Sequence, residues 1–496
     1  MTRNVLCFYV HQPDLNAKPG FQWAHTGTHF DRNITWWDKS HAWLTYLARC
    51  QYMLRQGKFA ADILYYCGEA VPNFVLIDRS PLAGYDFDTV NAQALLARAS
   101  ADNGRVTLQG GISYRYLVIP DNVGEAMTPA VIKKLGELVE GGVTLLGSRP
   151  LHAPGLTEYP HCDDQVKQLA DALWGTDSSV SGMRTVGSGR VIWGKSLQEV
   201  IDADRLPPDV ELKALPSNVQ LDWIHCRSVA GDIYFIANLD DRQVSTQITF
   251  RNQGKIPELW DPVTGSIRQL NEFSEENGRT TVPMQFEPCQ SFFVVFRQSS
   301  NGSRPIAGKR NFPELTAFAT LSGPWEVSFD PEWGGPNRVV FEQLEDWSKR
   351  PEDDIRYYSG TATYRKSFDL PGASREHIYL DLGEVKNLAQ VRLNGQDLGV
   401  VWTAPWRIEI GHVARETGNR LEIEVVNLWP NRLIGDGKLP KDQRRTVTNV
   451  LTYDSVLPKD YEDSGCPNCE ERKRTGKEPA LLPSGLLGPV VLQRKV

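Results

Sequence analysis

The 496-residue sequence predicts a multidomain protein in which α/β layers come first and all-β domains follow. In the first part, apolar runs of strand length alternate with segments whose apolar residues recur at helical spacing. From about residue 216 the pattern changes to short strands of alternating apolar and polar residues. A stretch rich in Ser, Asn, Gly and Arg interrupts this second part and is typical of a linker. We therefore expect five segments: 1–90, 91–215, 216–298, the linker 299–311, and 312–496.

Residues 1–90 show the order strand, aromatic-rich loop, helix, strand. Residues 5–10 are a continuous apolar run, residues 60–67 predict a second apolar strand, and residues 41–56 carry apolar side chains at helical spacing before Gly57. Two strands separated by one helix predict a βαβ unit with parallel strands. A complete (β/α)₈ barrel takes about 250 residues, so we expect this segment to be the end of a truncated barrel. Its first apolar run is expected to be a buried strand and not a secretion signal.

The remaining segments have clearer local patterns. Residues 91–215 predict strands at 116–120 and 143–147 and helices at 128–140 and 164–174, which indicates a flavodoxin-like or Rossmann-like layer domain. No GxGxxG motif follows a strand, so a dinucleotide site is not indicated. Residues 216–298 predict a small β-sandwich and residues 312–496 a jelly roll. Within the latter, Asn394-Gly395 between two apolar runs predicts a tight hairpin turn.

Composition narrows the range of partners. The formal net charge is -7, with no basic stretch of the kind that binds nucleic acid. No apolar run reaches the roughly 18 residues that a membrane span requires. We therefore expect neither nucleic acid nor membrane as a partner. Fourteen tryptophans and sixteen tyrosines are a high aromatic content, and because aromatic rings stack on the apolar faces of sugars, this favours a carbohydrate partner.

The candidate site residues lie where the strands of the first segment end. Reactive groups in parallel α/β folds gather at the carboxyl ends of strands. His11 follows the first predicted strand and Glu69 the second, and the loop between them carries His29, Asp31, Arg32, Trp36 and Trp37. This mixture offers hydrogen-bond partners for hydroxyl groups together with stacking faces. The alternatives are structural: the two tryptophans could be core aromatics, His29 a hydrogen-bonded loop residue, and Glu69 a cap for the following turn.

A family resemblance covers nearly the whole chain. Residues 5–73, above all the motif at 26–37 (TGTHFDRNITWW) and residues 46–54 (YLARCQYML), resemble the catalytic barrel end of the α-L-rhamnosidases of glycoside hydrolase family 106. Residues 127–129 and 154–156 are similar to an amidotransferase-like accessory domain of that family. The segments 382–385, 391–395, 398–399, 402–406, 418–423 and 484–490 resemble the galactose-binding-like jelly roll shared with family 2 hydrolases.

The resemblance implies inverting hydrolysis of terminal α-L-rhamnosides during the breakdown of plant or microbial polysaccharides. It implies a calcium ion that contacts the sugar, a rhamnose-containing oligosaccharide or polysaccharide as partner, and a full-length protein that is periplasmic or secreted. It places the acid and base Glu residues upstream of Met1, so that His11, His29, Asp31, Arg32, Trp36, Trp37 and Glu69 would bind and position substrate. This chain alone would then be inactive. The alternatives are a non-catalytic carbohydrate-binding module, a family 2-like β-glycosidase, and domains that only assemble a larger enzyme.

Overall fold

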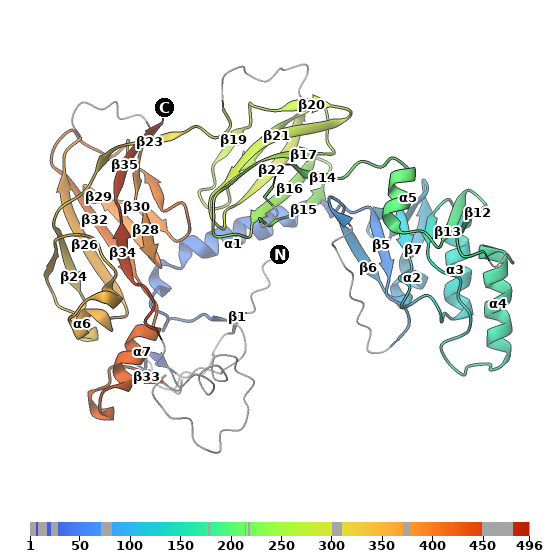
Figure 1. Cartoon of the computed structure of the whole chain (residues 1–496), viewed down its shortest axis with the longest axis horizontal. Helices are drawn as coiled ribbons and strands as arrows, with labels where there is room; N and C mark the ends of the chain where they lie inside the picture. The colour runs from blue at the N-terminus through green and yellow to red at the C-terminus, as the bar shows by residue number, and fades with distance from the viewer. Residues whose placement is uncertain are drawn as a thin grey trace. The chain divides into compact units, whose positions relative to one another are not determined.

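The computed structural model describes residues 6–7, 17–20, 28–70, 82–176, 179–213, 215–216, 219–299, 310–370, 377–448 and 480–495, with side chains from residue 17 onward except at 28 and 29. The chain forms two compact units (Figure 1). One unit combines Met1–Ala48 with Pro313–Val496, and the other is Arg49–Phe312. Within the described ranges, the structure has no helix with the length and apolar character needed to cross a membrane.

The first layer of the Arg49–Phe312 unit is a six-stranded sheet with the order β12-β13-β11-β10-β5-β6. Its strands are β5 (Ile63–Tyr66), β6 (Phe87–Val90), β10 (Tyr116–Val118), β11 (Thr144–Leu146), β13 (Gly189–Trp193) and β12 (Gly182–Val186). All pairs are parallel except the β12–β13 pair. Numbered along the chain, the five parallel strands lie in the order 2-1-3-4-5, which is the flavodoxin-like arrangement. The flavodoxin-like prediction is therefore confirmed.

This topology corrects the prediction for residues 1–90. We expected the strand within 60–67 to belong to a barrel, yet β5 pairs with β6 and β10 of the flavodoxin-like sheet. The expected βαβ pairing is wrong as well, because β1 (Leu6–Cys7) pairs in parallel with β3 (Thr28–His29). An apolar run buried on both faces is common to barrels and to open parallel sheets, so its composition could not distinguish them. The boundary at residue 90 falls inside the layer domain.

Alternating side chains of the sheet supply two cores. On one face Leu64, Leu117 and Leu145 are fully buried, and on the other Ile63 and Val118 are buried with few exposed atoms. Each fully buried aliphatic side chain contributes about 1.5–3 kcal/mol to folding. The elements that follow the strands are α2 (Ala92–Arg98), α3 (Pro129–Glu140), α4 (His161–Trp174), α5 (Leu197–Ala203) and a meander of β7 (Ala99–Asp102), β8 (Arg105–Leu108) and β9 (Ile112–Tyr114). Side chains of α3 and α4 join the first core, and those of α5 join the second.

The second layer of this unit is a β-sandwich, as the alternating pattern predicted. One sheet has the order β14-β17-β21-β20 and the other β19-β18-β22-β16-β15-β4. The strands are β4 (Lys58–Phe59), β14 (Val210–Lys213), β15 (Leu221–Arg227), β16 (Asp232–Asn238), β17 (Val244–Phe250), β18 (Lys255–Trp260), β19 (Ile267–Gln269), β20 (Ser274–Glu276), β21 (Arg279–Phe286) and β22 (Ser291–Ser299). Strand β4 belongs to this sandwich, and the next strand in the chain, β5, belongs to the flavodoxin-like sheet. The chain therefore passes directly from the sandwich into the flavodoxin-like domain at this point. Most of the linker expected at 299–311 lies outside the described residues.

The other unit contains the second all-β domain. Its two main sheets have the orders β23-β35-β27-β31 and β25-β24-β26-β32-β29-β30, and β28 pairs with β34. The strands are β23 (Leu315–Thr320), β24 (Trp325–Phe329), β25 (Val339–Phe341), β26 (Thr361–Phe368), β27 (Ile378–Asp381), β28 (Glu384–Lys386), β29 (Leu388–Leu393), β30 (Gln396–Val401), β31 (Arg407–Glu409), β32 (Asn419–Val426), β34 (Gly485–Gly488) and β35 (Val491–Lys495). The short helices α6 (Asp353–Arg356) and α7 (Pro430–Gly437) lie between strands. Asn394 and Gly395 both have positive φ, 55° and 84°, and form the predicted turn between β29 and β30.

Residues from the two ends of the chain come together in this unit. Helix α1 (His41–Leu54) starts here, preceded by the 3₁₀ turn η1 (Trp37–Lys39). β2 (Pro19–Gly20) pairs in parallel with β33 (Val447–Thr448), and the Thr448 hydroxyl donates to the Gly20 carbonyl at 2.7 Å. Pairing over more than four hundred residues is not visible in any local pattern.

Candidate carbohydrate-binding site

A cluster of aromatic rings follows strand β3. Phe30 is buried, and its ring centroid lies 5.6 Å from that of Trp36, 5.0 Å from that of Trp37 and 5.3 Å from that of Trp43. Trp36 also meets Trp43 edge-on at 5.9 Å. Trp37 keeps 36% of its surface exposed. Phe30 therefore holds the tryptophans in place, and Trp37 retains an exposed apolar face that suits a sugar ring.

The turn between Phe30 and the 3₁₀ segment is fixed by Asp31. Its carboxylate accepts a hydrogen bond from the backbone N–H of Asn33 at 2.7 Å, and its carbonyl accepts from the N–H of Ile34 at 3.2 Å. Arg32, between them, is exposed. Asn33 is 3% exposed, and its side-chain oxygen has no partner among the described residues. A buried acceptor is usually paired, so this one offers an unused hydrogen-bonding position beside the aromatic cluster.

The loop is attached to the jelly roll by backbone carbonyl groups. The Trp429 indole N–H donates to the carbonyl of Asn33 at 2.7 Å, and the Thr35 hydroxyl donates to the carbonyl of Asn427. Trp429 in turn packs edge-on against Trp333, with centroids 4.9 Å apart. Of the polar side chains of the loop, these bonds use only the Thr35 hydroxyl. Asp31, Arg32 and Trp37 thus remain at the surface of a firmly held segment.

A charged group on β32 completes this attachment. The Lys39 ammonium lies 2.8 Å from a carboxylate oxygen of Glu424, and Arg392 lies 2.5 Å from its other oxygen. Burial alone would raise the pKa of Glu424, but hydrogen bonding and charge from Lys39, followed by Arg392, lower it below the usual range. Glu424 is therefore a carboxylate with a structural role and not a proton donor.

The two histidines of the candidate set contribute little to this picture. His11 lies outside the described residues. For His29 only the backbone is described, in β3, where it is paired with Cys7 of β1. The structure thus brings together Asp31, Arg32, Trp36 and Trp37 on one loop, and the roles proposed for both histidines stay predictions.

Glu69 belongs to the other unit and is engaged at the start of a helix. Its carboxylate accepts from the Thr128 backbone N–H and from the Thr128 hydroxyl, both at 2.8 Å. Thr128 is the N-cap of α3, whose first N–H groups need acceptors. Next to it, Gly68 has a φ of +82°, and a Cβ there would lie 2.6 Å from the Val123 side chain. Glu69 is therefore engaged at the start of α3 and not at the turn that follows β5, and its role in substrate binding stays a prediction.

The jelly-roll tryptophans considered for stacking on sugar are partly covered. Trp402 meets Tyr46 of α1 edge-on, with centroids 5.2 Å apart, and Trp406 packs against the domain core. Trp402 therefore contributes to the contact between helix α1 and the jelly roll.

A calcium ion finds no prepared site in the described part of the chain. Calcium takes about six to eight oxygen ligands, several of them carboxylates. Within the described ranges, no group of three or more His, Cys, Asp or Glu side chains is arranged to hold a metal ion. Asp31, the acidic member of the loop, is committed to its own turn. The described residues do not form such a site, and calcium stays a prediction of the resemblance.

Sequence reasoning missed the partners that hold the loop. Lys39, Glu424 and Trp429 were not among the candidates, although residues 427–431 (NLWPN) directly follow residues 421–426 (LEIEVV), whose alternation is typical of a strand. A tryptophan with an asparagine two residues away on either side, at the end of a strand, was a usable signal. The pairing of Lys39 with Glu424, separated by almost the whole chain, had none.

Comparison with known proteins agrees with this architecture. The family described as alpha-L-rhamnosidase, glycoside hydrolase family 106, matches residues 1–274. A glycosyl hydrolase 2 galactose-binding domain-like family matches residues 345–447, within the jelly roll. The structure of a rhamnosidase from Novosphingobium sp. PP1Y aligns with 97% of this chain at 31% identity and a TM-score of 0.81.

Other relatives are more distant. A putative beta-glucuronidase of Formosa agariphila is 24% identical over an alignment that covers 99% of this chain. A β-glucuronidase from Ruminococcus gnavus overlaps 24% of the chain with a TM-score of 0.20, which is too low for a comparison of folds. The chain spans 60% of the length of the Formosa protein and 43% of the Novosphingobium rhamnosidase. With more than half of its residues matched by one family and its fold shared with a rhamnosidase, this chain belongs to glycoside hydrolase family 106.

Proposed function

We propose that this chain serves a glycoside hydrolase that removes terminal α-L-rhamnose from plant or microbial oligosaccharides or polysaccharides. The observation that carries the proposal is the 31% identity, over 97% of the chain, to a solved rhamnosidase. The galactose-binding-like match in the jelly roll supports a carbohydrate partner. A periplasmic or secreted location of the full-length protein is part of the same proposal.

Inverting hydrolysis needs an acid and a base. One carboxyl group protonates the leaving oxygen, and the other, about 6.5–9.5 Å away, activates water on the opposite face of the sugar. In our proposal this pair is supplied from outside residues 1–496. The supporting observation is that three carboxylates considered above are already engaged: Asp31 in its turn, Glu69 at α3 and Glu424 with Lys39.

In this proposal the loop at residues 30–37 binds the sugar and positions it. The exposed face of Trp37 stacks on the apolar face of the sugar, and the Arg32 guanidinium donates to ring hydroxyls. The bonds from Trp429 and Thr35 hold the loop before substrate arrives. A group fixed beforehand loses less conformational entropy on binding.

Purified 1–496 tests both parts of this proposal. We expect no turnover of an aryl α-L-rhamnoside, with or without calcium, and saturable binding of L-rhamnose in titration calorimetry. Robust turnover would overturn the proposal that the acid and the base come from outside residues 1–496. If rhamnose does not bind, the positioning role of the loop is wrong.

A second candidate function comes from the name of one relative, a putative beta-glucuronidase. A parallel assay with an aryl β-D-glucuronide separates the two candidate functions, since only a β-glucuronidase is expected to cleave it. A non-catalytic binding module of the jelly roll is a third possibility. It predicts that Trp402→Ala weakens oligosaccharide binding while Trp37→Ala leaves it unchanged.

A further inference from the structure

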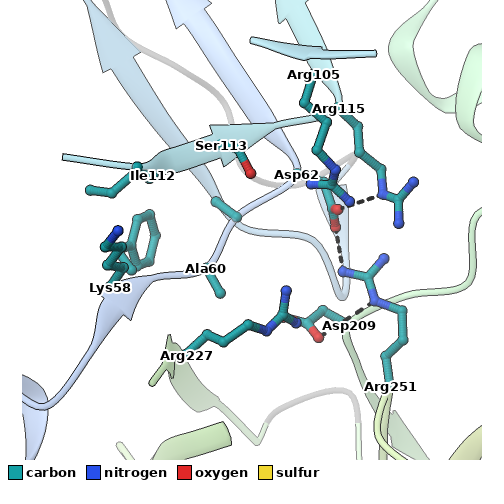
Figure 2. A pocket seen from close by; sticks show the side chains of 13 residues that line it. Lys58, Ala60, Asp62, Arg105, Ile112, Ser113, Arg115, Asp209, Arg227 and Arg251 are labelled. Carbon is teal, nitrogen blue, oxygen red and sulfur yellow. Dashed lines mark hydrogen bonds and ion pairs between the residues drawn. The ribbon is translucent and has the colours of Figure 1, made fainter. Parts of the chain in front are cut away.

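A pocket rich in basic side chains lies within the Arg49–Phe312 unit, where the meander of the flavodoxin-like layer meets the β-sandwich (Figure 2). Its volume is about 140 Å³, enough for several water molecules or a small ion. Residues of β8 and β9, with Arg115 and residues 60–62, form one part of the lining. Strand β4 of the sandwich, with Asp209, Arg227 and Arg251, forms the other.

The lining carries an excess of positive charge. Five basic side chains face two acidic ones, namely Lys58, Arg105, Arg115, Arg227 and Arg251 against Asp62 and Asp209. Figure 2 shows the guanidinium groups approaching the pocket from both layers. Like charges repel strongly where water is partly excluded, so an arrangement of this kind costs folding free energy unless a counter-charge is present.

Both acidic residues are already engaged: Asp62 by two of the arginines, and Asp209 by Arg251, His225 and Tyr234. Asp62 is 3% exposed, and its two oxygens lie 3.2 Å from Arg115 and 2.6 Å from Arg251. Arg251 also lies 3.6 Å from the second acid, Asp209, which is 2% exposed. Arg227 pairs outside the lining, at 2.9 Å from Asp232. Neither aspartate is left to neutralise a further cation.

Two cations have no direct counter-ion: Lys58 is exposed, and the Asp62 carboxylate acts on Arg105 only through its charge. Within the described residues, Arg105 and Lys58 make neither an ion pair nor a side-chain hydrogen bond with a carboxylate or carbonyl. Arg105 is only partly exposed, and burial, followed by the charge of Arg115, lowers its pKa from the ordinary value. A partly buried guanidinium that is repelled by its neighbours is a costly feature for a merely structural residue. A basic group of this kind that lines a pocket is a candidate for binding an anion.

We propose that this pocket binds a small oxyanion: a free phosphate or sulfate ion, or the carboxylate of an acidic sugar. The Arg105 guanidinium and the Lys58 ammonium donate to its oxygens. Guanidinium groups present paired N–H donors that match the spacing of oxygens in all three anions. The Ser113 hydroxyl, which also lines the pocket, is available as a further donor. This inference does not depend on the proposed function.

Titration calorimetry of the full chain at constant ionic strength tests the inference. The probes are sulfate, phosphate and D-glucuronate, with potassium chloride and neutral L-rhamnose as controls. We expect saturable binding of an oxyanion at one site, weakened about 10-fold or more by Arg105→Gln, because a charge-assisted hydrogen bond is lost. The matched control, Arg98→Gln on the exposed end of α2, leaves the affinity unchanged.

A stability measurement keeps the test independent of folding defects. Since Arg105 has no ion pair to lose, ligand-free Arg105→Gln should unfold at the same temperature as the parent chain or a higher one. The relative affinities of sulfate, phosphate and D-glucuronate identify the source of the oxyanion. Equal affinity in Arg105→Gln, Lys58→Gln and the parent chain would overturn the proposal, as would an effect that chloride reproduces in full.

Discussion

The imidazole of His225 lies against the carboxylate of Asp209, with Nδ1 2.7 Å from Oδ2, and both side chains are buried. The other ring nitrogen, Nε2, lies 3.1 Å from Asp232. Carboxylates only accept hydrogen bonds, so both ring nitrogens donate and the ring is an imidazolium. Burial alone would lower the pKa of His225, but the hydrogen bonds to Asp209 and Asp232 raise it above the ordinary value of 6.5.

This arrangement predicts that the stability of the unit decreases both at alkaline pH and at acidic pH, for two different reasons. Because the pKa of His225 is raised on folding, its stabilising contribution is complete below about pH 6.5 and is lost as pH rises through the folded value. The pKa values of Asp209 and Asp232 are lowered, so their contribution is present above about pH 3.9 and is lost on acidification. Scanning calorimetry should show the unfolding temperature of this unit falling at both extremes.

Replacing the histidine isolates the alkaline part of that profile. We expect His225→Gln to lower the free energy of unfolding by about 3–5 kcal/mol, since a buried carboxylate loses its cation. The loss of stability on raising the pH from about 6.5 should then disappear. His152→Gln, at an exposed position in the same unit, serves as the control. An unchanged alkaline profile in His225→Gln would show that another group titrates.

Local patterns in the sequence predicted the strands of the all-β domains well. Residues 361–368 form β26, in which alternate residues face a core and solvent in turn. The turn at Asn394 and Gly395 was predicted because these two residue types tolerate positive φ. Helix α3 begins after Thr128, a side chain that caps the first turn, with Pro129 at its first position. Each of these features depends on neighbours within a few residues.

Pairing between distant segments could not be predicted in this way. The sheet to which β5 belongs depends on β6 and β10, and nothing in its four apolar residues specifies those partners. The candidate loop is held by Trp429 and Glu424, almost four hundred residues away. The oxyanion pocket gathers basic residues from separate segments of two layers. A single sequence without its fold does not reveal such clusters.

The Glu69–Thr128 bonds predict a structural effect of mutation. Glu69→Gln should destabilise the Arg49–Phe312 unit by about 1 kcal/mol, because a carboxylate at a helix N-terminus is replaced by a neutral group. Affinity for rhamnose should not change. Thermal unfolding of this variant, of Thr128→Ala and of the double variant measures the coupling between the two residues. Additive effects, or a selective loss of rhamnose affinity, would contradict the capping role.

The Lys39–Glu424 pair predicts an effect on the loop at low pH. The lowered pKa of Glu424 means that the pair stabilises the loop above about pH 4.3 and loses this effect as pH falls through the folded value. Lys39→Met should increase backbone amide hydrogen exchange in residues 30–40 at neutral pH. Lys441→Met, a change of the same type in the 3₁₀ segment Lys441–Gln443, is the control. Equal exchange in Lys39→Met and the parent chain would mean that the hydrogen bonds from Trp429 and Thr35 are enough to hold the loop.

The exposed face of Trp37 gives the most direct test of the loop. Trp37→Ala should weaken rhamnose binding about 2- to 10-fold, the range expected for the loss of one stacking contact. Its effect on stability should be small relative to that of Phe30→Ala, because Phe30 is buried beneath three tryptophans. Leu44→Ala on α1 is a matched control, since Leu44 is 39% exposed and Trp37 36%. If Leu44→Ala weakens rhamnose binding as much as Trp37→Ala does, the effect comes from general loss of apolar surface and not from stacking.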